Sequence, residues 1–368
     1  MAKSMCKDVT PTPTDHAAGQ AAQVAKPKHR KRRVVRLACV LLVAMLVALG
    51  FYYQKKTYFP IYPIDSRVTF AGKPLGIYYL DMPIPWRPAG EAVDPEGFGL
   101  RVDDRGLSYR HPVIQCELVF DAYHVYAQTK SPQDAQAVVR LADLLVGQMK
   151  NVKLGGVDCT VLQYDAQLDA CMPHPIPWIS SMAQGMAMSA LCRAYEVEPK
   201  PEYLQAAKAC LAVFDVDVKD GGVRGMDEQG NVYYEEYPFP GQAYHVLNGF
   251  IYTLLGLHDL NRATGDEKAG QLFAQGLATL KAPGVLDRYD MGYWTTYDQS
   301  PFHWPSFNYN AIHVRQLWVL HKITGDQLFK DTADKWMRYN LEHKYRIQFF
   351  ASSSVSRVMR KCGAYRPK

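Results

Sequence analysis

From residue 112 onward the chain alternates mostly apolar helices with amphipathic ones, and this repeat constrains the fold more than any other feature. Two of the junctions read Thr-Gly-Asp, at residues 264–266 and 324–326. Glycine readily ends one helix and aspartate caps the start of the next, so both junctions mark corners between helices. The predicted pairs are 112–129 with 131–150, 175–196 with 200–215, 241–264 with 266–281, and 305–324 with 326–343.

The two members of a pair differ in where their apolar side chains lie. Residues 310–320 are apolar nearly all round, which is typical of a helix enclosed by others. In residues 326–343, Phe329 and Trp336 lie on one face while Lys330 and Asp334 lie on the other, which is typical of an outer helix. The pattern therefore predicts a mainly α fold, an incomplete α/α toroid of four inner–outer pairs, with a site built from the loops at one end.

A short β-rich region, residues 57–110, precedes the toroid, which is predicted over residues 111–343. Residues 67–70 and 77–80 are rich in β-branched and aromatic residues and predict strands. Residues 100–109 predict a hairpin. A basic tail is expected over residues 344–368.

The N-terminal part predicts a membrane anchor. Residues 1–33 form a basic leader that we expect to be disordered, and residues 37–53 carry no charge, which predicts a transmembrane helix over 34–54. The basic cluster precedes the apolar run, so the leader is expected in the cytoplasm. The rest then lies in a periplasm, or in a Golgi lumen if the source is eukaryotic. A cleaved signal peptide is the alternative.

The net charge of +6 comes from the leader, because residues 1–36 hold nine Lys and Arg against two Asp. The remainder is close to neutral, which argues against a nucleic-acid-binding domain. No pair of cysteines has metal-ligand spacing, and neither a metal nor a cofactor is expected.

The cysteines beyond the anchor predict one disulfide and several thiols. Cys159 and Cys171 flank a loop-like segment, and we expect them to bridge in an oxidising compartment. Cys116, Cys192 and Cys210 fall on predicted helices and are expected to be buried thiols.

Residues 233–238 set two adjacent carboxylates, Glu235 and Glu236, among three tyrosines at a predicted strand-to-helix junction. The turn-rich residues 220–231 before them predict a hairpin. A carboxylate and a phenol placed against a sugar ring can both move protons. The alternative is an edge strand with solvated glutamates and packed tyrosines. A second linker, residues 282–304, is dense in Tyr, Trp and Asp, which stack on sugars and bond their hydroxyls.

Four blocks in register over about residues 109–343 resemble the C-terminal domain of the D-glucuronyl C5-epimerases. Those enzymes invert C5 of glucuronic acid in heparan-type chains and give iduronic acid. The blocks are Trp178-Ile179-Ser180-Ser181-Met182-Ala183-Gln184-Gly185 with Arg193-Ala194-Tyr195, Tyr234-Glu235-Glu236-Tyr237-Pro238 with Val246-Leu247-Asn248-Gly249-Phe250, Tyr297-Asp298, and Tyr309 with His313, Gln316 and Leu317. Tyr109-Arg110-His111-Pro112 is a weaker match.

The resemblance implies an acidic polysaccharide substrate and the catalytic set Glu236, Tyr237, Tyr297 and Tyr309. Serine stands at position 300, where the family has an arginine, and residues 303–306 also differ, so the identity of the polymer stays open. Whether the chain forms a homodimer stays open as well. The candidate substrate-binding residues are Tyr109, Trp178, Gln184, Tyr234, Arg288, Tyr293, Asp298, Asn310 and His313.

The chemistry asks for a base, an acid and groups that hold the carboxylate, because C5 of a uronic acid is only weakly acidic. Glu236 and Tyr309 would act on opposite faces of the ring, and His313 or Arg288 would lower the pKa of a tyrosine base. A polysaccharide lyase shares the first step and stays open. So do a glycoside hydrolase that uses Glu236 with Asp290 or Asp298, and a membrane-tethered subunit that binds polysaccharide without catalysis.

Overall fold

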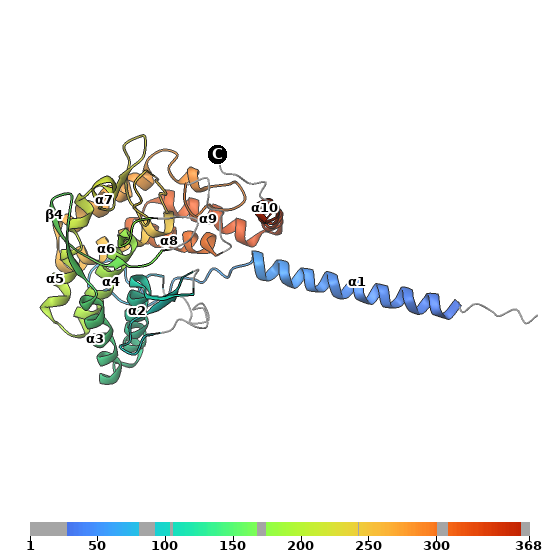
Figure 1. Ribbon diagram of the computed structural model, residues 1–368, viewed down its shortest axis with the longest axis horizontal. Coiled ribbons are helices and arrows are strands. Elements are labelled where there is room, and N and C mark those ends of the chain that lie inside the picture. The colour runs from blue at the N-terminus through green and yellow to red at the C-terminus, as the bar shows by residue number, and fades with distance from the viewer. Residues whose placement is uncertain are drawn as a thin grey trace, which may run out of the picture. The chain divides into compact units, whose positions relative to one another are not determined.

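The computed structural model describes residues 28–80, 93–103, 106–167, 174–241, 243–299 and 308–361 (Figure 1). The chain divides into two compact units, Met1–Tyr52 and Tyr53–Lys368. Helix α1 runs over Lys28–Thr57. Its segment Val34–Lys55 is long and apolar enough to cross a membrane, by length and composition, with a mean hydropathy of 2.7. The predicted helix is therefore present, while its insertion in a membrane stays a prediction.

Eight helices of the second unit form the incomplete α/α toroid that the sequence predicts (Figure 1). The inner helices pack on one another in chain order, and each outer helix packs on the inner helix that precedes it. The inner helices are α2 (Pro112–Thr129), α4 (Ser181–Val197), α6 (Leu247–Thr264) and α8 (Tyr309–Thr324). The outer helices are α3 (Pro132–Gly147), α5 (Pro201–Ala209), α7 (Glu267–Lys281) and α9 (Gln327–Leu341).

The Thr-Gly-Asp corners form as predicted. Gly265 and Gly325 end α6 and α8 in the left-handed conformation, with φ of 70° and 72°. Asp266 accepts a hydrogen bond from the backbone N–H of Ala269 at 3.1 Å and so caps α7. Asp326 accepts from the backbone N–H of Leu328 at 3.0 Å and caps α9. These local contacts turn each inner helix into its outer partner.

The inner helices α4 and α6 touch at the level of their backbones. A Cβ atom on Gly256 would lie 1.9 Å from the carbonyl oxygen of Gly185, so both positions need the absence of a side chain. Near the start of α4, the hydroxyl of Thr253 on α6 donates to the hydroxyl of Ser181 at 3.0 Å. The close approach therefore holds the start of α4 against the middle of α6.

Within the described residues the strands form four antiparallel pairs, each of two strands. The hairpins near residues 100–110 and 224–234 were predicted, whereas the linker 151–174 was expected to be a loop and instead contains a hairpin and the first strand of another pair. The pairs are β1 (Leu100–Val102) with β2 (Ser108–Arg110), β3 (Lys150–Leu154) with β4 (Val157–Val161), β5 (Gln163–Tyr164) with β6 (Trp178–Ile179), and β7 (Arg224–Met226) with β8 (Val232–Tyr234).

Several helix boundaries were predicted wrongly. The inner helices α4 and α6 begin at residues 181 and 247, later than the predicted 175 and 241. The residues before α4 pair with β5 as strand β6, and the first residue of α6, Leu247, donates its N–H to the carbonyl of Tyr297 at 3.2 Å. Long-range pairing thus replaces the expected first turns. Outer helix α5 ends at Ala209 and is followed by a 3₁₀ turn, Ala212–Asp215.

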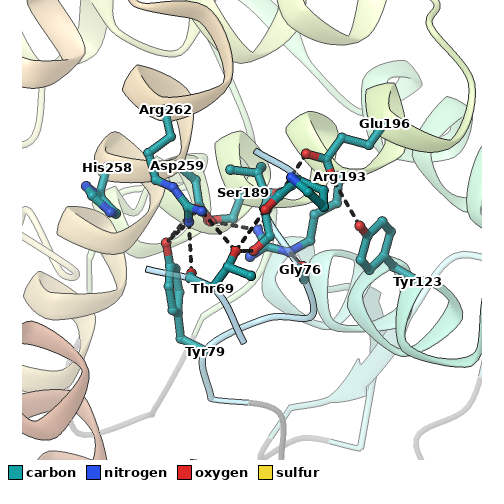
Figure 2. A network of polar contacts seen from close by, with 12 residues as sticks. Thr69, Gly76, Tyr79, Tyr123, Ser189, Arg193, Glu196, His258, Asp259 and Arg262 are labelled. Atoms are coloured by element: carbon teal, nitrogen blue, oxygen red, sulfur yellow. Dashed lines mark hydrogen bonds and ion pairs between the residues drawn. The ribbon is translucent and has the colours of Figure 1, made fainter. Parts of the chain in front are cut away.

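The strands predicted at 67–70 and 77–80 do not form, and a single bridge between Val68 and Gly76 remains of them among the described residues. Side chains of the inner helices occupy the backbone groups that a strand partner would take. Arg193 of α4 donates from Nε to the carbonyl of Gly76 at 2.9 Å, and Arg262 of α6 donates to the carbonyl of Thr69 at 3.0 Å (Figure 2).

A buried polar network holds this segment on the helices (Figure 2). Asp259 pairs with Arg193 at 2.6 Å, with both side chains fully buried, and accepts from the hydroxyls of Tyr79 at 2.5 Å and Ser189 at 2.8 Å. Burial raises the pKa of Tyr79 well above its ordinary value, and the neighbouring carboxylate raises it too. Arg193 and Asp259 lie toward the C-terminal ends of α4 and α6, away from the first turns of the inner helices.

The segment predicted as a basic tail, residues 344–368, contains most of helix α10 (His343–Lys361), in which Arg346 is buried and donates to Thr57 at 3.0 Å. One expectation about the cysteines needs correction. Cys159 is a free thiol whose Sγ donates to the carbonyl of Val157, so the predicted bridge is not formed; Cys171 lies outside the described residues. The thiols predicted to be buried, Cys116, Cys192 and Cys210, are buried.

Candidate active site

A carboxylate and three phenols meet at the end of the toroid where the inner helices begin. The hydroxyl of Tyr297 donates to Oε1 of Glu236 at 3.0 Å, and the hydroxyls of Tyr237 and Tyr297 are 2.9 Å apart. Either hydroxyl can be the donor in the second bond. The ring of Tyr309 lies 4.4 Å from that of Tyr297. All four predicted catalytic residues are thus brought together.

The first turns of three inner helices hold this cluster. Ser181, which starts α4, donates its N–H to the carbonyl of Glu235 at 3.0 Å and its hydroxyl to the carbonyl of Tyr234 at 2.8 Å. The start of α6 bonds to the backbone of Tyr297, and Tyr309 is the first residue of α8. Residues far apart in the chain therefore reach one place because the helices that carry or bond them begin there.

The two adjacent glutamates point to opposite sides of the chain. Glu236 is directed to Tyr297, whereas Glu235 accepts from the backbone N–H of His245 at 3.0 Å and contacts its Nδ1 at 2.6 Å. Both glutamates are buried, so the alternative of an edge strand with solvated glutamates is wrong. Alternation along an extended segment separates the two carboxylates.

The carboxylate of Glu236 lies directly on the backbone of α6. A Cβ atom on Gly249 would lie 2.1 Å from Oε2 of Glu236 and 2.8 Å from its Cβ. Oε2 is buried and has no hydrogen-bond partner among the described residues. A buried carboxylate oxygen without a partner is costly to fold, which makes this atom a candidate for contact with a ligand.

The surroundings move the pKa of Glu236 close to neutrality. Burial raises it to about 7, although hydrogen bonds from Tyr237 and Tyr297 act to lower it. The charge of Asp298 also raises this pKa, and the charge of Arg101 lowers it. A carboxyl group with such a pKa can both take and release a proton at neutral pH.

The phenols of the cluster stay protonated. Burial raises the pKa of Tyr309 to about 12, and the charge of Glu236 raises it as well. Burial and the same charge raise the pKa values of Tyr237 and Tyr297 well above their ordinary range. At neutral pH the three tyrosines are therefore hydrogen-bond and proton donors.

An aromatic wall adjoins the cluster. The ring of Trp178 lies 6.0 Å from that of Tyr237 and stacks on Tyr164 at 4.1 Å. His174 and Phe239 stack on each other at 4.2 Å beside it. Of these residues, only Trp178 and Tyr237 are predicted from the sequence to belong to the site. The strands that bring Tyr164 to Trp178 are only two residues long, which is too short for a recognisable alternation of apolar and polar residues. The sequence pattern therefore did not point to Tyr164.

The two expected helpers of a tyrosine base do not act as such. Burial lowers the pKa of His313 to about 3, so its ring, 6.2 Å from that of Tyr309, is neutral and provides no positive charge. Its Nδ1 lies 3.0 Å from the hydroxyl of Thr295. Arg288 pairs with Asp227 at 2.9 Å, on the β7–β8 side of the domain.

Other candidates have structural partners. The amide of Gln184 bonds both backbone groups of Leu162, the hydroxyl of Tyr234 donates to the carbonyl of Leu272 on α7, and Nδ2 of Asn310 donates to the carbonyl of Trp336 on α9. Asp290 accepts from Trp336 and Tyr339 and pairs with Lys335, so it is not the partner of Glu236. Tyr109 and Tyr293 are half-buried and pack on the core.

The family model described as the D-glucuronyl C5-epimerase C-terminus matches residues 155–338, which contain the whole cluster. The chain belongs to this family. Within it, a D-glucuronyl C5-epimerase of Caenorhabditis elegans is 35% identical over 227 residues, which cover 56% of this chain and 35% of the relative. An uncharacterized protein of Methanocaldococcus jannaschii is 31% identical over 162 residues, which cover 43% of this chain and 51% of the relative. The match thus spans about half or less of each relative.

Solved structures of other sugar-converting enzymes are similar at a lower level. A D-mannose isomerase has a TM-score of 0.45 at 14% identity and covers 67% of this chain and 65% of its own. A cellobiose 2-epimerase of Bacillus thermoamylovorans has a TM-score of 0.42 at 14% identity, with coverage of 67% and 66%. In the part of this chain that the structure describes, no group of three or more His, Cys, Asp or Glu is arranged to hold a metal ion.

Proposed function

We propose that this member of the family is a polysaccharide uronate C5-epimerase, which converts D-glucuronic acid residues to L-iduronic acid or acts on a similar pair. One observation carries the proposal: a buried glutamate with a pKa of about 7 is bonded to a chain of protonated tyrosines. Membership of the family supports the reaction class.

In the proposed reaction Glu236 takes the C5 proton on one face of the ring. The pair of electrons left at C5 is delocalised into the substrate carboxylate as an enediolate, to which Tyr237 donates a hydrogen bond. Tyr309 then delivers its phenolic proton to C5 from the other face. A base works best when its pKa is near the working pH, which is the case for Glu236.

Tyr297 completes the cycle. It donates to Glu236, and its ring contacts that of Tyr309. When Tyr309 has given up its proton, Tyr297 can pass it one and take the proton that Glu236 has gained. The net result is the inversion of C5, with every protein group returned to its starting state.

A single experiment tests this function against the alternatives. The full chain is incubated in D₂O with an unsulfated glucuronate polymer, and the products are analysed by NMR and mass spectrometry. Deuterium at C5 without shortening of the chain is expected. An unsaturated uronate that absorbs in the ultraviolet would indicate a lyase, new reducing ends a hydrolase, and an unchanged polymer a binding protein.

The setting of this activity is part of the proposal. We infer that α1 anchors the chain in a membrane with the basic leader in the cytoplasm, and that the toroid acts on acidic polysaccharide on the other side. The basic residues ahead of Val34 and the apolar segment that follows support this orientation.

A further inference from the structure

The β1–β2 hairpin carries a cation, Arg101, on the same face as Tyr109. Arg101 lies directly opposite Tyr109 in the antiparallel register, and opposed residues project from the same face of a hairpin. Tyr109 packs on the core, and its ring lies 5.7 Å from that of His111. The ring of His111 lies 5.1 Å from Tyr164, on which Trp178 stacks. A continuous series of aromatic contacts thus connects this face to the aromatic wall.

The charge of Arg101 reaches both ends of the proposed proton path. Burial is the main influence on Glu236 and Tyr309 and raises both pKa values, and the charge of Arg101 acts against it at each group. Arg101 itself is exposed and forms no ion pair with any residue that the structure describes. The positive charge of Arg101 therefore acts on both the proposed base and the proposed acid.

Neighbouring arginines are already engaged. Arg110, next on the same hairpin, pairs with Asp94 and Glu96 at 2.7 and 2.6 Å. Arg288 pairs with Asp227, as described above, and position 300 holds a serine, which carries no charge. The substrate brings a carboxylate attached to the reacting carbon, and its charge grows as the C5 proton leaves. A guanidinium matches a carboxylate in shape and charge.

We propose that Arg101 binds the carboxylate of the uronic acid residue that reacts at Glu236. This assignment rests on the proposed function and names the group that recognises its substrate. Arg101 enters from the hairpin that precedes α2, whereas the base and the acid come from the linker before α6 and from the start of α8. The hairpin is therefore the part of the domain that distinguishes a uronic acid from a neutral sugar.

Binding and exchange are measured separately on Arg101→Gln, Arg101→Lys and the matched control Arg110→Gln, which removes a cation from the opposite face of the same hairpin. The ligands are an unsulfated glucuronate polymer and the same polymer with its carboxyl groups reduced to alcohols. The wild type should prefer the uronate form. Arg101→Gln should lose roughly 10- to 100-fold of that preference and bind the reduced polymer as before. Arg101→Lys should retain part of it, and Arg110→Gln should behave as wild type.

The outcomes separate this inference from the function on which it rests. If Arg101→Gln is folded and keeps the full preference for the uronate polymer, Arg101 is not the recognition group. If the wild type prefers the uronate polymer through Arg101 but incorporates no deuterium at C5, the recognition stands and the epimerase function fails. If the wild type binds both polymers equally, the inference is overturned.

Discussion

Glu236 and Tyr309 take different parts in the proposed reaction because their surroundings give them different pKa values. Glu236→Gln keeps the shape and an acceptor for Tyr297 but cannot take a proton, and Tyr309→Phe keeps the ring but cannot give one. We expect each change to reduce C5 deuterium exchange on the order of 100- to 10,000-fold while the fold stays intact. Circular dichroism and exchange by mass spectrometry check both points.

The matched control for these variants is Tyr234→Phe, because that hydroxyl is bonded to Leu272 on α7 and lies outside the cluster. It should cost about 1 kcal/mol of stability and leave exchange unchanged. Glu235→Gln is less suitable as a control, since Glu235 is buried against His245 and its replacement is expected to lower stability. Normal exchange in Glu236→Gln would show that another group is the base.

The raised pKa of Glu236 predicts opposite effects of pH on activity and on stability. Only the ionised carboxylate can take a proton, so kcat/KM for exchange should rise with pH and level off above about 7. The pKa of Glu236 is about 7 in the folded protein and 4.5 in the unfolded chain, so between these pH values the folded protein binds more protons than the unfolded chain. The contribution of Glu236 to the free energy of unfolding therefore falls as pH rises through this interval. Above pH 7 the variant Glu236→Gln should therefore be more stable than wild type, by roughly 1–3 kcal/mol.

Denaturant titrations at pH 5 and pH 8 measure this difference. Tyr237, Tyr297, Asp298 and Arg101 face the same carboxyl group and are unchanged in the variant, so the comparison isolates Glu236. Equal stability of the two proteins at pH 8, or a pH–activity profile that is flat between pH 5 and pH 8, would contradict the assignment.

The position of the Glu236 carboxylate, the proposed base, depends on how α6 packs against the linker before it. Because a side chain on Gly249 would overlap the carboxylate of Glu236, Gly249→Ala should displace that group. A shift of about 1 Å is enough to reduce kcat by roughly 100-fold. Binding of the polymer should change little, because Gly249 is on α6 and not on the β1–β2 hairpin that carries Arg101. The measurement is kcat and KM for C5 exchange.

Gly147→Ala is the control for this helix substitution. Gly147 ends α3, and a Cβ there meets nothing within 4 Å. Exchange should be unchanged, and helix propensity favours alanine by up to about 1 kcal/mol. If folded Gly249→Ala retains wild-type kcat, the contact with Glu236 does not position the base.

For the whole chain, the basic leader and the apolar helix together predict which side of the membrane holds the toroid. In bacterial cells that express the full chain, protease added to spheroplasts should digest the part beyond residue 56 and leave the leader intact. Detergent should expose the leader as well. Protection of the toroid in intact spheroplasts, with digestion after detergent, would reverse the proposed orientation.

The helix pairs and the Thr-Gly-Asp corners could be read from the amino acids alone. The reason is physical: apolar periodicity, a capping aspartate such as Asp266 and a left-handed glycine such as Gly265 act through neighbours within a few positions. The alternation of Glu235 and Glu236 is local as well. The resemblance to the epimerase family then selected Glu236, Tyr237, Tyr297 and Tyr309.

Long-range contacts settled the rest. The described residues at the expected starts of α4 and α6 are not helical, because Trp178 pairs with Tyr164 and Leu247 bonds to Tyr297. Three predicted site residues donate hydrogen bonds to backbone carbonyls of distant segments: Gln184, Tyr234 and Asn310. The charge of Arg101 acts on Glu236, which is more than a hundred positions away in the chain. The residues adjacent in the chain do not specify such partners, because the partners come into contact only when the inner helices pack together.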